Sequence, residues 1–136
     1  MRPFDKTDEG KVWLANLLKD KGFQNITETS KYEHWDLIAS YANKVYIFEL
    51  KNRDFTSDTY GDVALEEKKV KALLDTPFKV ILVYFWTDCW TMVDLRNTPY
   101  TTITRSHRAT TRFGNSKDIT TTWATWKLDT LKLLSY

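Results

Sequence analysis

The feature that most constrains the fold is a nearly unbroken apolar run over residues 78–86. A run of this length, rich in β-branched and aromatic residues, is typical of a strand that is buried on both faces. Such a strand needs a layer of structure on each side, so the sequence predicts a sheet that lies between helices. Thr87 and Asp88 then turn the chain into a second run, residues 90–95, which we expect to pair with the first.

Helical signals occur in two places. Acidic residues follow Thr7, where the positive end of a helix dipole favours them, and Gly22 has the usual position just past a helix end. We therefore predict a first helix over residues 7–21. A second helix is predicted over residues 61–75, in which apolar residues recur at helical spacing, at Val63, Val70 and Leu74.

A β-hairpin is predicted around Ala42-Asn43, the only polar break between two extended segments. Symmetric pairing about this break places Asp36 opposite Glu49, and Lys51 on the same strand face as Glu49. Opposed carboxylates repel each other unless a cation lies between them. An exposed ion pair is the alternative explanation for Glu49 and Lys51, but their apolar strand neighbours argue against a solvated face. The hairpin therefore predicts a metal site.

Composition limits the class of protein. A chain of 136 residues with a net charge of +2 fits a single domain over residues 1–136. The single Cys89 excludes a disulfide framework, and with two histidines a zinc site of the usual ligands is not expected. No apolar run reaches membrane-spanning length, and the N-terminus does not begin a signal peptide. We expect a cytoplasmic protein with no membrane contact.

The C-terminal third carries a local excess of positive charge. Between Arg96 and Lys127, six Lys or Arg residues stand against one acid, Asp118. Cations among small hydroxyl residues are typical of phosphate contacts, which predicts that Arg105, His107, Arg108 and Arg112 bind a nucleic acid. Trp123 and Trp126 could stack on unpaired bases, although packing explains both better. Up to residue 121 this threonine-rich region is predicted to be irregular, followed by a short element over 121–128 and a last helix or strand over 128–134.

The order of these features resembles the PD-(D/E)XK nuclease superfamily. Asp36 stands as the first metal-binding acid, and Glu49-Leu50-Lys51 stands as the (D/E)-x-K, with a polar loop and a helix after it. The likeness covers residues 7–95, and Trp35 replaces the proline of the family pattern. The later segments look similar to small phage-encoded members. The resemblance implies an α/β fold with a restriction-endonuclease-like core, in which a central mixed sheet is flanked by helices.

The resemblance also implies a cofactor and a reaction. Mg²⁺, for which Mn²⁺ can substitute, would be held by Asp36, Glu49, the carbonyl of Leu50 and an acid on the first helix, for which Glu9 is the candidate. The activity implied is hydrolysis of DNA phosphodiester bonds, in repair, recombination or phage DNA processing. The protein would act in the cytoplasm, that of the host cell if it is phage-encoded, alone or as a homodimer.

Several roles stay open on the sequence. Lys51 would position or deprotonate the attacking water, or stabilise charge on the phosphorane. The second helix would lend Glu66 and Lys69 to the site, unless these belong to surface ion pairs. His34 shares a strand face with Asp36 and either contacts the substrate or packs locally.

Two other classes of protein remain alternatives. One is a catalytically inactive protein of the same fold that binds nucleic acid or a protein partner. The other is an interaction protein in which the charges form a buried ion-pair network. The complete set of Asp36, Glu49 and Lys51 argues against a decayed catalytic site.

Overall fold

The computed structural model describes residues 1–29, 35–110, 114 and 116–136. It contains a five-stranded sheet in the order β1-β2-β3-β5-β6, the large sheet, and a three-stranded sheet in the order β4-β8-β7, the small sheet. The elements in chain order are α1 (Thr7–Asp20), β1 (Gln24–Glu28), β2 (Leu37–Tyr41), β3 (Lys44–Asn52), β4 (Asp62–Glu66), α2 (Glu67–Leu74), β5 (Lys79–Phe85), β6 (Trp90–Asp94), β7 (Thr101–Thr110), β8 (Ser116–Lys127) and a 3-10 turn, η1 (Leu128–Thr130).

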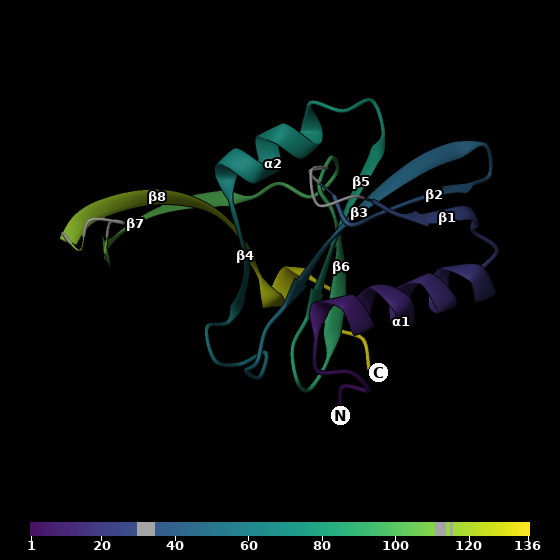
Figure 1. Ribbon diagram of the computed structural model, residues 1–136, viewed down its shortest axis with the longest axis horizontal. Helices are drawn as coiled ribbons and strands as arrows, with labels where there is room; N and C mark the ends of the chain where they lie inside the picture. The colour runs from purple at the N-terminus through teal and green to yellow at the C-terminus, as the bar shows by residue number, and fades with distance from the viewer. Residues whose placement is uncertain (30–34, 111–113, 115) are drawn as a thin grey trace.

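The two helices lie on opposite sides of the large sheet (Figure 1). Leu14 and Leu18 of α1 pack on the face that contains Phe48 and Phe85. The other face is covered by α2 and the small sheet, whose side chains pack around Leu82 in a second buried cluster. Because β3 pairs antiparallel with β2 and parallel with β5, the sheet is mixed. The predicted fold class, a mixed sheet flanked by helices, is confirmed.

The predicted hairpin is confirmed, and its register is confirmed between Leu37 and Phe48. Ala42 and Asn43 have φ values of 50° and 63°, as a two-residue turn of type I′ requires. Leu37 is paired with Phe48, as symmetric pairing about this turn predicts. Just beyond the last pair, the Asp36 N–H also donates to the Phe48 carbonyl at 2.8 Å, so Asp36 and Leu37 share one partner residue, as in a β-bulge. The regular register therefore ends at Leu37 and Phe48, and Asp36 is not paired directly with Glu49.

The second predicted helix is wrong in its first half. Residues 62–66 form strand β4, and helix α2 begins only at Glu67. Val63 and Leu65 are buried while their neighbours are more exposed, which is the period-two pattern of a strand. The strand is stabilised by pairing with residues 123–127 of β8, a partner about 60 residues away that local spacing does not reveal.

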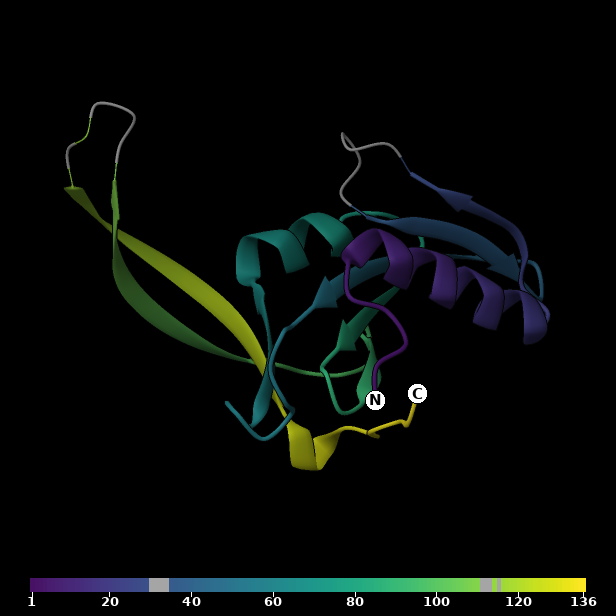
Figure 2. The ribbon, with the colours of Figure 1, turned by 60° about the horizontal axis from the view of Figure 1, so that its bottom comes forward.

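The threonine-rich region is also not irregular, which corrects the prediction. β7 and β8 form a long antiparallel hairpin, and β-branched threonine favours such strands. Two of these threonines, Thr101 and Thr125, share a hydroxyl–hydroxyl hydrogen bond of 3.0 Å across the ladder. The hairpin projects away from the rest of the molecule in both ribbon views (Figures 1 and 2).

The first predicted helix is confirmed as α1, and Gly22 beyond it has a φ of 95°, which favours glycine. At the other end, the expected last short element is η1, after which Leu134 makes an isolated bridge with Trp90. The two termini lie near each other (Figures 1 and 2). None of the described helices is long and apolar enough to cross a membrane.

Candidate metal centre

Asp36 lies where the ladder between β2 and β3 ends. Its Oδ2 accepts a hydrogen bond of 2.7 Å from the Leu50 N–H, in the place that a backbone carbonyl of a longer β2 would take. The N–H and C=O of one strand residue point to the same side of the strand. The carbonyl of Leu50 therefore faces the same gap as the Asp36 carboxylate.

Glu49 is buried on the sheet face that α2 covers, with 5% of its surface exposed. Its two oxygens have different lysine partners: Lys51 Nζ lies 3.7 Å from Oε1, and Lys69 Nζ lies 3.7 Å from Oε2. Burial and the negative charge of Asp36 raise the pKa of Glu49 to about 7, although both lysines oppose the shift. The two acids are thus close enough to interact electrostatically.

Lys11 of α1 is a third cation at the site. Its Nζ lies 3.6 Å from Asp36 Oδ1 and 3.6 Å from Asp8 Oδ1. Sequence reasoning missed this residue, although a signal was present. Lys11 shares a helix face with the buried Leu14 and Leu18, and a lysine on the apolar face of a helix needs an anionic partner.

The other candidates occupy different positions. Glu9 and Glu66 are exposed, on α1 and at the end of β4. Among the described residues no group of three His, Cys, Asp or Glu side chains is arranged to hold a metal ion, so Glu9 does not join the two acids. Arg105 is exposed on β7. His107 and Arg108 have a described backbone in β7 but no described side chains, and Arg112 and His34 lie outside the described residues.

The donors at this site fit a magnesium ion in type. Mg²⁺ takes oxygen ligands, of which only a few come from protein while water and phosphate supply the rest. Asp36, Glu49 and the Leu50 carbonyl offer such oxygens around one gap in the sheet. Three lysines lie against the two carboxylates, and one of them, Lys11, is shared with Asp8.

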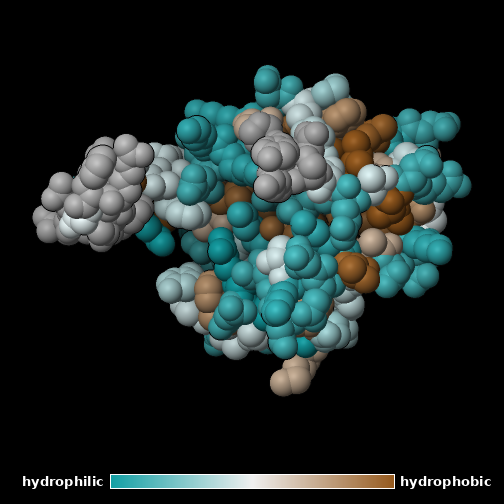
Figure 3. Space-filling model, viewed as in Figure 1, coloured by the Kyte–Doolittle hydropathy of each residue, from teal (hydrophilic) through white to brown (hydrophobic). Residues whose placement is uncertain are grey.

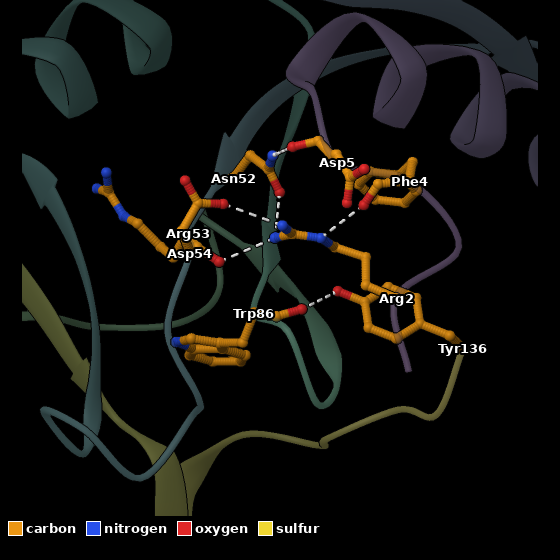
Figure 4. A network of polar contacts seen from close by, with 8 residues as sticks. All are labelled: Arg2, Phe4, Asp5, Asn52, Arg53, Asp54, Trp86 and Tyr136. Atoms are coloured by element: carbon orange, nitrogen blue, oxygen red, sulfur yellow. Dashed lines mark hydrogen bonds and ion pairs between the residues drawn. The ribbon is translucent and has the colours of Figure 1, made fainter.

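The strand that carries Lys51 is held in place by the N-terminus (Figure 4). The Arg2 guanidinium donates to Asn52 Oδ1 and to the carbonyl of Arg53, and pairs with Asp54 at 3.0 Å. On the neighbouring strand, the Tyr136 hydroxyl donates to the Trp86 carbonyl. Both ends of the chain therefore brace the ends of β3 and β5.

We expect Arg2→Ala to lower the free energy of unfolding by about 1–3 kcal/mol, because partly buried acceptors lose a charged donor. Urea denaturation measures the change. Asp54 is the matched control, since it is 88% exposed and its pairing with Arg2 should contribute little. An Asp54→Ala variant that loses as much stability as Arg2→Ala would contradict this account of the brace.

Among known proteins, similarity to this chain is found at the level of structure. No protein-family model matches the sequence, and no curated protein matches it. Among solved structures, Hjc from Archaeoglobus fulgidus, a Holliday junction resolvase from an archaeal hyperthermophile, is similar at a TM-score of 0.49 and 15% identity. The match covers 68% of this chain and 78% of that chain. A match at this degree of similarity does not identify an activity. The side chains of the site are the basis for an inference about function.

Proposed function

We propose that this chain is a metal-dependent nuclease that hydrolyses phosphodiester bonds of DNA. The observation that carries the proposal is a buried carboxylate, Glu49, kept beside a second acid, Asp36, at an opening in the sheet. Burying a carboxylate next to another is unfavourable for folding, and such perturbed groups concentrate at functional sites. Lys51 and Lys69 at the same carboxylate supply positive charge that suits a phosphate substrate.

Each residue then has a role in the reaction. Asp36, Glu49 and the Leu50 carbonyl would hold Mg²⁺, which stabilises negative charge and lowers the pKa of a bound water. The Lys51 amine, next to Glu49, orients the attacking water or accepts its proton, or stabilises charge on the phosphorane. Lys69 approaches from α2 and contributes a second positive charge on the same side. Glu66 is exposed, and in the described part of the chain it forms no ion pair with Lys51 or Lys69.

The β7–β8 hairpin is the proposed DNA-binding arm. A two-stranded ribbon fits the width of the major groove of B-DNA, and this one carries Arg105, His107 and Arg108 on β7 with Arg112 beyond it. Hydrophilic residues dominate the face of the molecule seen in Figure 3, which suits a charged, hydrated partner. A role in repair, recombination or phage DNA processing, a cytoplasmic location and a homodimer remain predictions.

Incubation with labelled linear, circular and branched DNA tests the activity. Cleavage is expected with Mg²⁺ or Mn²⁺ and none with EDTA. The lysine partners of both acids also fit the alternative of an inactive nuclease-fold protein, in which ion pairs replace the metal. DNA that is bound but uncut with either metal would favour that alternative, and a chain that binds no nucleic acid would exclude the nuclease and leave only a role in binding a protein partner.

The arginines of the arm give a prediction about binding. Replacing Arg105, Arg108 and Arg112 with alanine should weaken DNA affinity and flatten its salt dependence, by roughly 0.9 in the log–log slope for each lost phosphate contact. Fluorescence anisotropy at several salt concentrations measures both quantities. A matched control replaces three exposed lysines at the opposite end of the molecule, Lys19, Lys21 and Lys44, with the same loss of charge. Equal slopes for the two variants would show that the arm is not the DNA-binding surface.

A further inference from the structure

A pocket of about 210 Å³ is lined by Tyr84, the neighbour of Lys51 on β5, and apart from Arg105 its lining residues have no role in the function proposed above. Its aromatic lining comes from Phe55 and Tyr60, in the loop after β3, and from Trp123 of β8. Its charged lining is Arg53, Asp62 and Arg105. The pocket therefore combines residues of both sheets and of the loop that joins β3 to β4.

The strand β3 connects the pocket to the metal centre. Glu49 and Lys51 lie on one face of β3, and Arg53 follows on the same side, where its guanidinium stacks on the Tyr84 ring at 5.2 Å. Tyr84 lines the pocket and is the parallel neighbour of Lys51 on β5. Two residues of strand span roughly 7 Å, so the pocket lies within the reach of one nucleotide from Lys51.

The size and walls of the pocket fit one small aromatic group. An apolar cavity of about 150 Å³ accepts benzene, whereas pockets for drug-sized ligands begin at roughly 300 Å³. Phe55 and Tyr60 form an edge-to-face pair with ring centroids 5.0 Å apart, and Tyr60 is 64% exposed. Trp123 is half-buried, whereas Trp126 is enclosed in the core and donates to the Thr98 carbonyl. Of these two tryptophans, Trp123 is the one in position to stack on a base.

The polar groups of the pocket fit the rest of a nucleotide. The Arg53 Nε donates to the Tyr84 hydroxyl at 2.8 Å, and this bond orients the guanidinium. Because the hydroxyl is neutral, it does not neutralise the positive charge of Arg53, which can then bind a phosphate. Asp62 is half-buried, and this burial raises its pKa although the charge of Arg105 opposes the shift. An ionised carboxylate only accepts hydrogen bonds, so Asp62 favours a base with an amino group over thymine, whose one ring N–H stands between two carbonyls.

We propose that this pocket binds one unpaired nucleotide of the DNA substrate, with its base against Tyr60 and Trp123 and its phosphate at Arg53 and Arg105. The substrate class that follows is DNA with a flap, overhang or single-stranded end. Amino-bearing bases, guanine above all, are preferred to thymine at the unpaired position. The placement next to the cleaved bond depends on the proposed nuclease function, but the binding preference does not.

Affinity measured in EDTA, where no cleavage occurs, tests the pocket separately from the chemistry. The probes are a blunt duplex and the same duplex with one unpaired dG or dT at its end. The parent chain should bind the dG overhang about tenfold more tightly than the blunt duplex, as expected from stacking of one base. Tyr60→Ala and Trp123→Ala should each reduce this ratio towards one, and Trp123→Phe should keep most of it.

Two variants complete the design. Tyr41→Ala removes another exposed tyrosine, which packs on Phe23 far from the pocket, and should leave the ratio unchanged. Asp62→Asn replaces a carboxylate, which only accepts hydrogen bonds, with an amide that also donates them. This variant should therefore show a smaller preference for dG over dT. Parent affinities that are equal for blunt and overhang DNA would overturn the proposal, as would a ratio that survives both aromatic replacements. So would free dGMP binding as tightly as the overhang DNA, because the site would then be one for mononucleotides.

The two proposals can fail independently. If the parent chain cleaves no DNA yet shows the overhang preference, the nuclease function is wrong and the pocket is supported. If it cleaves DNA with equal rates for the parent, Tyr60→Ala and Trp123→Ala on blunt and overhang substrates, the nuclease function stands and the pocket proposal is wrong.

Discussion

Lys51→Ala is expected to reduce the rate of DNA cleavage by about 10²–10⁴-fold, the usual contribution of a group that moves a proton or stabilises charge in the transition state. DNA affinity should change little, because an interaction made mainly in the transition state contributes little to binding of the substrate. Single-turnover cleavage at saturating enzyme measures the first quantity, and anisotropy in EDTA measures the second.

Lys69→Ala separates direct chemistry from an indirect effect. Both lysines lie 3.7 Å from an oxygen of Glu49, so removing either one raises the pKa of that carboxylate. If Lys51 acts only through Glu49, the two variants should lose activity to the same extent, and both should recover at higher pH. A deficit of Lys51→Ala that persists at high pH and exceeds that of Lys69→Ala would support a role in the reaction itself.

The proximity of Asp36, Glu49 and Lys51 could be predicted largely because strand geometry depends on local sequence. Side chains alternate along a strand, and one polar turn at Ala42-Asn43 fixes the register up to Leu37 and Phe48, so placing Asp36 near Glu49 needed no information from distant residues. The same argument placed Lys51 beside Glu49, and the structure has this contact. The gap at which the Leu50 N–H bonds to the Asp36 side chain could not be predicted, because it depends on where β2 ends.

The small sheet could not be predicted, because its strands are stabilised by distant partners. In β4, Val63 has helical spacing to Val70 and Leu74, and its alternation with Leu65 is too short to identify a strand until β8 is known to lie alongside. The β7–β8 hairpin has no apolar alternation in its exposed part, so no periodic signal marked it. The pocket that contains Trp123 was hidden for the same reason, since its walls come from segments that only this sheet brings together.

The stability of the protein should depend on pH through Glu49. Its pKa is raised from 4.5 to about 7, so between these values the folded chain holds a proton that the unfolded chain has released. Folding stability therefore falls as pH rises from 4.5 to 7, and above pH 7 the ionised Glu49 disfavours the folded state by roughly 3 kcal/mol. Glu49→Gln should remove this penalty. We expect the variant to be more stable than the parent at pH 8 and equally stable at pH 4, as measured by urea denaturation.

Magnesium should favour the parent chain over Glu49→Gln in stability, because the ion binds the ionised carboxylate that the variant lacks. Added Mg²⁺ should raise the melting temperature of the parent chain at pH 8, with less effect as pH falls through 7, and should not raise that of Glu49→Gln. Glu66→Gln is the matched control, since Glu66 is exposed and its replacement should alter neither response.

Lys51 and Lys69 are 35% and 30% exposed, so they remain solvated when Glu49 loses its charge. A Glu49→Gln variant that is less stable than the parent at pH 8 would therefore mark a structural ion-pair network, and the interaction-protein alternative would replace the nuclease.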